Sequence, residues 1–579
     1  MSCIHSSEAN AISNRAQSSD PGPDFGILSG STPCLRFRRG TEAARRGDWL
    51  TKSILVALAS VLIGLFPMPS SAQSTWQWFD QGRPTAQAFQ ASAVLNAAAA
   101  DGLEPGDYRA DSLRDALERA REGPELPAAA VDRLDAELTA SMQHYLMDLH
   151  RGRIDPQQIR QDVKGLVPAP FDPVAYLSTA LAQDRLPQAV REARPDGVLY
   201  ADLRRALARY RTLSDHWAWE NELPPLPGGM VAAGQPYQGV FRLAQRLIAL
   251  GDLPADALIP EQYEGVLVEG VRAFQQRHGL LVDGVIGRDT MQQLQTRPAR
   301  RVRQIELALE RLRWTPLLEA PRMIVVNIPE FVLRAYEVRN RQADVQLQMK
   351  VIVGRAQRTP TPVMDGEIQH IEFSPYWNVP RSIVRSETLP RLRRDPAYFH
   401  QQGFEFVTPD GAVLATPSAA NIQALERGEL RIRQRPSPNN ALGDIKFIFP
   451  NGQNIFLHHT PAVALFDRYR RDFSHGCIRV EDPLGLAQFI LRDDAGWTPA
   501  RIRQAMTRGT SQTIRLIHPV PILISYSTVV VKNDKVHFFP DLYGLDSVLD
   551  QALQQRVRAA PLLEPRQPTD EKTRPGPCQ

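Results

Sequence analysis

Residues Asn454–Pro483 read NIFLHHTPAVALFDRYRRDFSHGCIRVEDP, and the rest of the chain is organised around them. The segment contains Cys477, and three of the chain's 12 histidines lie within 19 residues upstream of that thiol: His458, His459 and His475. A thiol becomes a nucleophile when a neighbouring imidazole takes its proton. The short apolar run Asn454–His458 predicts a strand that delivers a histidine, and Ile478–Val480 predicts a second strand. The pattern therefore indicates a cysteine nucleophile in a β-domain.

The turn that carries the thiol is Ser474-His475-Gly476-Cys477. Glycine tolerates a sharp backbone bend, so we expect the N–H groups of Gly476 and Cys477 to point at a developing oxyanion. The alternative is that Cys477 is a buried small hydrophobic residue and that the histidines are satisfied core residues. Alternation along a strand sends His458 and His459 to opposite faces, and the residues alone do not choose the base between them.

This stretch resembles the L,D-transpeptidase (YkuD) family, whose pattern is His-x-Thr followed by Ser/Thr-His-Gly-Cys-apolar-Asn/Arg. The chain supplies the whole pattern, as His458-His459-Thr460 and Ser474-His475-Gly476-Cys477-Ile478-Arg479. The resemblance implies that Cys477 is the nucleophile and His458 the base, because Thr460-Pro461 fixes which histidine is meant. It also implies that His459 supports the base through its carbonyl. His475 is then structural or a secondary proton carrier.

The resemblance implies the activity of a peptidoglycan L,D-transpeptidase. The Cys477 thiolate would attack the carbonyl of the third residue of a tetrapeptide stem, release the terminal D-alanine and form a thioester. The side-chain amine of a neighbouring stem would then complete a 3→3 cross-link. Carbapenems mimic the acyl donor for this family. Two alternatives stay open: an L,D-carboxypeptidase or cross-link hydrolase on the same site, and a non-catalytic cell-wall-binding protein.

Four further residues are candidates for binding the substrate. Arg479 either holds a substrate carboxylate or forms an ion pair with Glu481 or Asp482. Tyr376 and Trp377 either wall a stem peptide or are core aromatic residues. Asn440 lies beside Asn439 and close to Gly443, in a loop for which we expect positive φ angles and a substrate hydrogen bond.

Composition narrows the class of protein. A chain of 579 residues is too long for one hydrophobic core, so several domains are expected. The net charge of +4 and the lack of a basic run give no support to a nucleic-acid partner. The four cysteines form no Cys-x-x-Cys pair: Cys3, Cys34, Cys477 and Cys578. Neither a zinc site nor a redox dithiol is indicated, and we expect no metal and no cofactor.

The N-terminal segments indicate export. Residues 1–52 have no periodicity and are expected to be disordered, or an extension from a misassigned start codon. Residues 53–72 are expected to be a signal peptide, because the apolar run Ile54–Phe66 is followed by small residues at a cleavage site after Ala72. The expected location is therefore the periplasm. Association with the inner membrane is expected only if the signal stays uncleaved.

Two helical units should follow the signal peptide. Residues 73–225 have apolar positions at helical spacing and resemble the scaffold domain of the large Gram-negative branch of the family. Residues 235–297 contain VEGVRAFQQRHGLLVDGVIGRDTMQQL, which resembles the peptidoglycan-binding domain type 1, a three-helix module. We expect Asp289 or Thr290 to cap its third helix. Residues 298–320 predict a linker helix with a solvated charged face.

The period changes from helix to strand at Met323. Residues 321–553 are expected to be a mainly-β catalytic domain, a β-sandwich with helices. Residues from about 382 to 430 resemble a mobile subdomain that caps the catalytic cleft, and residues 554–579 predict a disordered tail. The whole chain is thus expected to be a multidomain protein whose partners are peptidoglycan stem peptides and glycan, with other cell-wall synthases possible.

Overall fold

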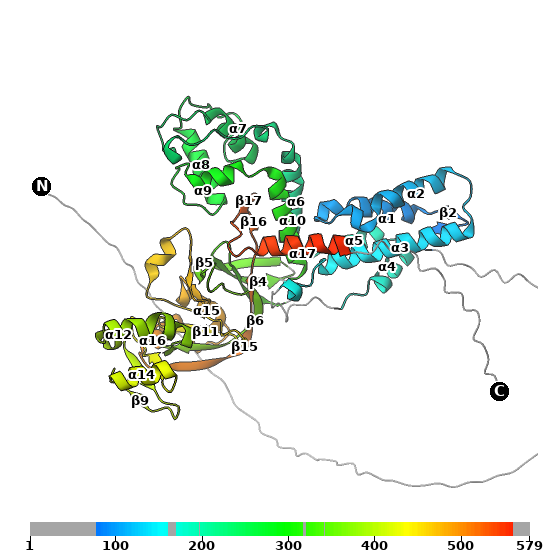
Figure 1. Cartoon of the computed structure of the whole chain (residues 1–579). Helices are drawn as coiled ribbons and strands as arrows, with labels where there is room; N and C mark the ends of the chain where they lie inside the picture. The colour runs from blue at the N-terminus through cyan, green and yellow to red at the C-terminus, as the bar shows by residue number, and fades with distance from the viewer. Residues whose placement is uncertain (1–76, 160–169, 196, 316–319, 341, 560–579) are drawn as a thin grey trace, which may run out of the picture. The chain divides into compact units, whose positions relative to one another are not determined.

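The computed structural model describes residues 77–159, 170–195, 197–315, 320–340 and 342–559. The expected N-terminal extension, the signal peptide and Cys578 lie outside the described residues. Within the described ranges, no helix combines the length and the apolar character that crossing a membrane requires. The described residues fall into three regions along the chain, and Figure 1 labels their main helices and strands.

The first region is helical, with a short hairpin of β1 and β2 at its start. Its elements are β1 (Phe79–Asp80), β2 (Arg83–Pro84), α1 (Ala86–Asn96), α2 (Ala110–Glu122), α3 (Ala128–Arg151), α4 (Pro173–Ala182), α5 (Leu186–Glu192) and α6 (Val198–Ser214). Helix α3 buries an apolar stripe that includes Leu138, Met142 and Tyr145 against α1 and α2. The Asp172 carboxylate caps α4 by accepting from the backbone of Val174 and Ala175.

The second region contains three helices, α7 (Val240–Leu250), α8 (Val266–Arg277) and α9 (Arg288–Gln295). Gly251 ends α7 in the left-handed conformation, with φ of 79°. Phe274 on α8 is fully buried in the core of this unit. The expected cap of the third helix is wrong, because α9 begins after Gly287 and Asp289 and Thr290 lie inside its first turn.

Helix α10 (Pro298–Arg313) follows, and the expectation of a solvated charged face is wrong. Four of its charged side chains are buried: Arg301, Glu310, Arg311 and Arg313. Glu310 is 0% exposed and accepts from the backbone N–H groups of Arg153 and Ile154 and from the guanidinium of Arg313. Helical periodicity identifies the apolar stripe of α10, but the opposite face is covered here by partners from distant parts of the chain.

Replacing Glu310 with leucine should destabilise the protein strongly. The guanidinium of Arg313 is also 0% exposed and would be left buried without its carboxylate. Breaking a buried pair by removing one partner costs about 3–5 kcal/mol. Burial alone would raise the pKa of Glu310, but Arg153 and Arg313 outweigh it and hold that pKa below its ordinary value.

Urea unfolding of the full chain at neutral pH measures this loss. The matched control is Glu269→Leu, because Glu269 is an exposed residue that pairs with Arg272 on the surface of α8. Surface pairs of this kind contribute about 0–1 kcal/mol. Equal stabilities of the two variants would contradict a structural role for the buried pair.

The third region is built on a large sheet. Its strands are β3 (Arg322–Asn327), β4 (Val332–Arg339), β5 (Gln342–Gly354), β6 (Met364–Phe373), β11 (Ile445–Ile448), β12 (Leu457–His458), β13 (Asp472–Ser474), β14 (Ile478–Val480) and β15 (Gln512–Ser525). Their order is β13-β5-β14-β12-β11-β6-β15-β3-β4, and β4 also pairs with β5. The pairing therefore closes into a ring. Strand β5 closes the ring, because its first part pairs with β4 and residues near its end pair with β14.

Helices and a second, smaller sheet complete this region. Helices α15 (Pro483–Leu491) and α16 (Pro499–Thr507) add Leu486, Ile490 and Ile502 to the core of the large sheet. The C-terminal elements are β16 (Val529–Lys532), β17 (Lys535–Phe538) and α17 (Leu545–Ala559). Asn533 and Asp534 both have positive φ angles in the hairpin turn between β16 and β17.

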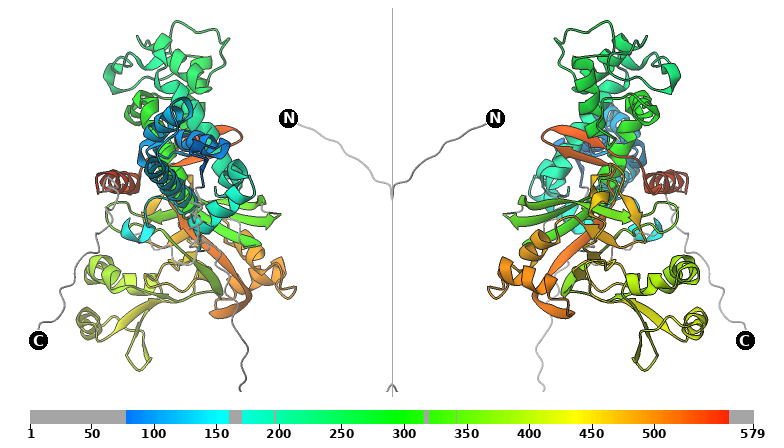
Figure 2. Two further views of the ribbon diagram at one scale, coloured as in Figure 1. Left: turned by 90° about the vertical axis from the view of Figure 1, so that its right-hand side faces the viewer. Right: turned by 90° about the vertical axis from the view of Figure 1, so that its left-hand side faces the viewer.

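We define the cap as residues 379–434, which form a lobe with its own core (Figures 1 and 2). Its elements, with the strand β7 that leads into it, are β7 (Trp377–Asn378), α11 (Arg381–Ile383), a π-helical turn (Val384–Thr388), α12 (Leu389–Arg394), α13 (Ala397–Gln401), β8 (Phe404–Val407), β9 (Val413–Leu414), α14 (Ala419–Arg427) and β10 (Arg431–Gln434). The four strands pair in the order β7-β10-β8-β9. The expected layout of helical scaffold, three-helix unit and mainly-β domain is confirmed.

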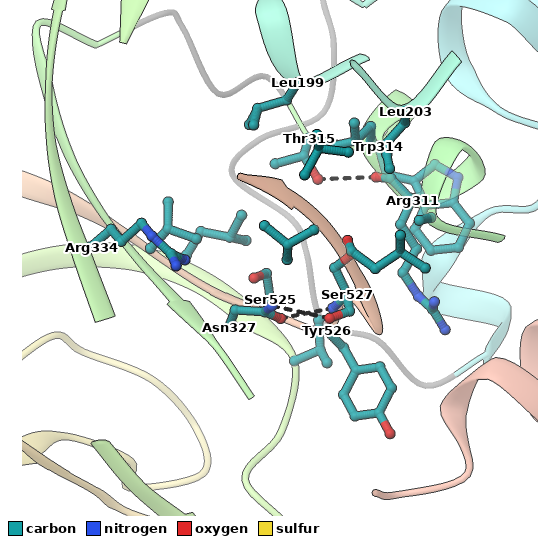
Figure 3. Close-up of a pocket in the computed structure, with 18 of the residues that line it drawn as sticks. Leu199, Leu203, Arg311, Trp314, Thr315, Asn327, Arg334, Ser525, Tyr526 and Ser527 are labelled. Carbon is teal, nitrogen blue, oxygen red and sulfur yellow. Dashed lines mark hydrogen bonds between the residues drawn. The ribbon is translucent and has the colours of Figure 1, made fainter. Parts of the chain in front are cut away.

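Figure 3 shows a cavity of about 130 Å³ between helices and the large sheet. Its walls come from α6, α10, β3, β4, β15 and β16, and they include Leu203, Trp314 and Tyr526. None of the site residues expected from the sequence lines it. The cavity therefore lies apart from the candidate active site.

Candidate active site

Two short neighbouring strands carry the expected nucleophile and base. Strands β12 and β14 are parallel, with Leu457 opposite Ile478 and His458 opposite Arg479. Leu457 and Ile478 are fully buried in the core of the sheet, so alternation puts His458 and Arg479 together on the other face. Cys477 immediately precedes β14, and the Ile478 N–H donates to the Phe456 carbonyl beside it. The expected cysteine and histidine therefore come from adjacent strands.

Hydrogen bonds from distant residues fix the turn before the thiol. Gly476 has φ of 117°, which a side chain would strain. The Ser474 hydroxyl accepts from the Gly476 N–H at 3.1 Å and donates to the Cys477 carbonyl. The Thr361 hydroxyl donates to the Gly476 carbonyl at 2.7 Å and accepts from the Gly354 N–H at 2.8 Å. The expectation that the Gly476 N–H is an oxyanion donor is therefore wrong, because Ser474 already occupies it.

Replacing Thr361 with valine should weaken both this turn and the fold. The substitution keeps the shape of a buried side chain but removes the partners of the Gly476 carbonyl and the Gly354 N–H. Each buried backbone group left unsatisfied costs about 1–3 kcal/mol. Thermal unfolding measures the loss, with Thr507→Val on the exposed surface of α16 as the matched control. If the melting temperature equals that of the control, the Thr361 hydroxyl does not stabilise the turn.

The thiol of Cys477 rests in its protonated form. It is half-buried and donates to the carbonyl oxygen of Asn454 across 3.7 Å. Burial raises the pKa of the Cys477 thiol, while the Phe456 N–H, Lys446 and Arg479 act in the opposite direction. Since the net shift is upward, this thiol needs a base before it can attack.

The imidazole of His458 is held in a fixed orientation and in its neutral form. It is 4% exposed, and its Nδ1 lies against the carbonyl oxygen of His459. A carbonyl only accepts, so Nδ1 carries the proton and Nε2 is left as the acceptor. Burial, with a contribution from Arg479, lowers the pKa of His458 to about 3. The ring is therefore neutral at physiological pH and can take a proton.

The other two histidines have partners of their own. His459 donates from Nδ1 to the Asp444 carboxylate at 2.8 Å, and its main-chain carbonyl orients His458. His475 donates from Nε2 to the carboxylate of Glu387, a residue of the cap, at 2.7 Å. The three histidines of the motif therefore point to three different partners.

Arg479 does not form the ion pair considered from the sequence. Glu481 pairs with Lys350 at 3.0 Å, and the carboxylate of Asp482 accepts from the backbone of Gly485 at the start of α15. The Nε of Arg479 is buried and has no hydrogen-bond partner among the residues that the structure describes. Its positive charge therefore lies beside Cys477 and His458 without a carboxylate to balance it.

Three family models match parts of the chain. Residues 321–522 match the YkuD family, described as the L,D-transpeptidase catalytic domain. This part of the chain is an L,D-transpeptidase catalytic domain. Residues 71–207 match the scaffold domain family, and residues 237–294 match the family described as "Putative peptidoglycan binding domain".

One relative and two solved structures are similar to the chain. A "Putative L,D-transpeptidase" of Haemophilus influenzae is 32% identical over 230 residues, which are 40% of this chain and 45% of that protein. The structure of Bdellovibrio bacteriovorus Bd1075 is 15% identical, with a TM-score of 0.15, over 41% of this chain and 56% of that one. A fused Zn-dependent amidase/peptidase/peptidoglycan-binding domain-containing protein from Clostridium acetobutylicum is 12% identical, with a TM-score of 0.15, over 51% of this chain and 99% of that one.

The expected substrate contact of Asn440 is wrong, because the L,D-transpeptidase domain uses this side chain internally. Asn440 is fully buried, its amide donates to the carbonyls of Pro375 and Arg435, and its oxygen accepts from the Leu442 N–H. In this loop, positive φ occurs at Gly443 but at neither asparagine. Asn440 therefore joins the segment that enters the cap to the segment that leaves it.

Tyr376 and Trp377 are half-buried at the entrance to the cap of the L,D-transpeptidase domain. The guanidinium of Arg433 lies over the Tyr376 ring, at 4.1 Å from its centroid. Trp377 belongs to β7 and packs against the core of the cap. Packing within the cap thus accounts for part of the surface of each ring, and contact with a stem peptide stays a prediction.

The sequence analysis missed three residues that shape the site. Thr361 clamps the turn, and Glu387 contacts it from the cap. Lys446 lies opposite His458 on β11 and places its ammonium over the Phe456 ring, at 4.1 Å from the centroid. The Thr-Pro-Thr sequence at 359–361 was a usable signal for the first of them. Within the described ranges, no cluster of three His, Cys, Asp or Glu residues is placed to hold a metal ion.

Proposed function

We propose that the protein is a peptidoglycan L,D-transpeptidase that forms 3→3 cross-links through a thioester on Cys477. The observation that carries this proposal is that Cys477 and His458 come from adjacent parallel strands, with Nδ1 of His458 held by the His459 carbonyl. A base that is neutral at working pH can accept the thiol proton and later return it to a leaving group.

In the first half-reaction, Cys477 turns from the Asn454 carbonyl and gives its proton to Nε2 of His458. The thiolate adds to the carbonyl carbon of the third residue of a tetrapeptide stem. The Cys477 N–H takes the role of oxyanion donor, since Ser474 occupies the Gly476 N–H. Collapse of the tetrahedral intermediate breaks the peptide bond. The D-alanine amine leaves with the proton from His458, and the acyl group stays on sulfur.

In the second half-reaction, the side-chain amine of a neighbouring stem attacks the thioester. His458 takes the proton that the amine loses as the new amide bond forms, and the sulfur leaves as the Cys477 thiol after protonation. The charge of Arg479 is suited to a stem carboxylate, because charge-assisted hydrogen bonds to guanidinium are strong. The cationic Lys446 also lowers the pKa of the thiol and so supports the thiolate.

The other domains fit a role at the cell wall. The unit at 237–294 would bind glycan or stem peptides and keep the catalytic domain close to its polymeric substrate. The signal peptide at 53–72 would place the protein in the periplasm, where that polymer is found. Other cell-wall synthases are candidate partners there.

Mass spectrometry of residues 73–579 after incubation with a carbapenem tests the acyl-enzyme. We expect one adduct, mapped to the peptide that contains Cys477. Incubation with tetrapeptide muropeptides should then release D-alanine and yield 3→3 dimers. If monomeric tripeptides form without dimers, the acyl-enzyme is hydrolysed and the protein is a hydrolase on the same site instead of a transferase. Lack of any adduct would overturn the proposal in favour of a wall-binding protein.

A further inference from the structure

A hydrogen-bonded pair of side chains joins the cap to the nucleophile turn. Glu387 of the cap accepts from Nε2 of His475 at 2.7 Å, and the two side chains are 35% and 30% exposed. His475 lies between Ser474 and Gly476, which a hydrogen bond within the turn joins. Among the described residues, no other side-chain hydrogen bond or ion pair joins residues 379–434 to the turn. The position of the cap is therefore coupled to the turn at a single point.

The local structure explains why Glu387 projects at this position. It lies in the π-helical turn Val384–Thr388, in the middle of a helical run that begins at Arg381 and ends at Arg394. Pro390 lies two residues after this turn, and proline has no N–H to donate to the residue four positions before it. A widened turn accommodates this missing bond, and such π-turns are frequent at functional sites. The π-turn rotates Glu387 relative to a regular helix.

The cap joins the rest of the domain through two chain segments. The entering segment contains Ser374, which is buried and has a positive φ of 46°. The leaving segment contains Asn440, whose amide donates to the Pro375 carbonyl of the entering segment. The core of the cap is separate from the core of the large sheet. The cap is therefore a separate lobe that two adjacent chain segments join to the rest of the domain.

We propose that Glu387 and His475 form a latch that holds the cap over Cys477 and limits the access of water to the thioester. The inference rests on the proposed function and adds a positioning pair to it. Transfer to an amine requires that the acyl-enzyme outlive attack by water, so an open cap diverts the same intermediate to hydrolysis. Breaking the latch changes the fate of the thioester more than its formation.

The test compares Glu387→Ala, His475→Ala and the double variant by the ratio of tripeptide hydrolysis product to 3→3 dimer. We expect each single variant to raise this ratio about twofold to fivefold, as for a partly exposed ion pair that acts as a unit. The double variant should match the single variants instead of multiplying their effects. Glu387→Gln keeps an acceptor for the imidazole N–H and should fall between the wild type and Glu387→Ala.

The matched controls are cap residues away from the turn. Glu429→Ala removes an exposed carboxylate that pairs with Arg427, and His400→Ala removes an exposed histidine of α13. Both should leave the product ratio unchanged. A ratio equal to wild type in Glu387→Ala, or effects of the two single variants that multiply in the double variant, would overturn the latch.

Hydrogen exchange separates failure of the latch from failure of the proposed function. In the protein without substrate, Glu387→Ala and His475→Ala should each speed exchange of residues 381–394 to the same extent. If the wild type forms no adduct at Cys477, the proposed function fails, while equal loss of protection would still support the contact. Unchanged exchange in both variants would overturn the latch whatever the activity of the wild type.

Discussion

Replacing Cys477 with alanine should abolish the carbapenem adduct, the release of D-alanine and the formation of dimers. Covalent catalysis is lost altogether when the nucleophile is removed, and in a comparable hydrolase this costs roughly 10⁶-fold in kcat. The loss applies equally to the transferase and to the hydrolase that shares its first half-reaction. The measurement is intact-protein mass spectrometry together with chromatography of the muropeptide products.

The same variant should keep its fold and its binding to cell-wall polymer. The Cys477 side chain is half-buried and its thiol makes one long hydrogen bond, to the Asn454 carbonyl, so truncation removes little packing. Sedimentation with purified peptidoglycan should therefore be the same for the wild type and for Cys477→Ala. An adduct that persists in the variant would show that another nucleophile reacts, and Cys578 is then the first residue to map.

The sequence identified the candidate nucleophile and base but not the residues that hold them in place. Cys477 and His458 belong to short contiguous motifs, and the resemblance of His458-His459-Thr460 to the family pattern, not strand alternation, singled out His458. Thr361 is 115 residues from its partner Gly476, and that bond depends on how β5, β13 and β14 pair. Local periodicity does not determine the register of strands that are so far apart in the sequence. The bond between Thr361 and Gly476, and the use of the Gly476 N–H by Ser474, could therefore not be predicted.

Two wrong predictions, the substrate contact of Asn440 and the solvated face of α10, have related causes. The loop at Asn440 was recognised from its composition, but composition does not say whether an amide faces a substrate or the neighbouring backbone. The charges on α10 looked solvated because a helical pattern describes one buried face only. Glu310 is buried by Arg153, 157 residues away, and by Ile154, 156 residues away. In both cases the partners are distant in sequence, and the local pattern contains no trace of them.

Replacing His458 with alanine should slow acylation of Cys477 by about 10²–10⁴-fold, the usual contribution of a positioned general base. His459→Ala is the matched control, because its main-chain carbonyl stays in place and only the imidazole that pairs with Asp444 is lost. We expect that control to acylate at nearly the wild-type rate. If instead His459→Ala were the slow variant, the roles of the two histidines would be reversed.

The pH dependence of acylation gives a sharper test of the same assignment. The pKa of His458 is about 3, so protonation of this base does not slow the wild type between pH 8 and pH 5, and its rate should stay nearly flat over that window. In His458→Ala the thiol must ionise alone, and burial raises its pKa above the ordinary value. The rate of the variant should therefore rise about tenfold per pH unit until the thiol titrates. Parallel acylation profiles for the wild type and the variant would show that His458 does not take the proton of the thiol.

The stability of the wild-type fold, unlike its acylation rate, should depend on pH in the acidic range. Because a histidine with an ordinary pKa of 6.5 is held neutral, the folded state binds fewer protons than the unfolded state, and stability falls as the pH drops from about 6.5 toward 3. His458→Ala removes this contribution and should lose less stability over the same acidic range.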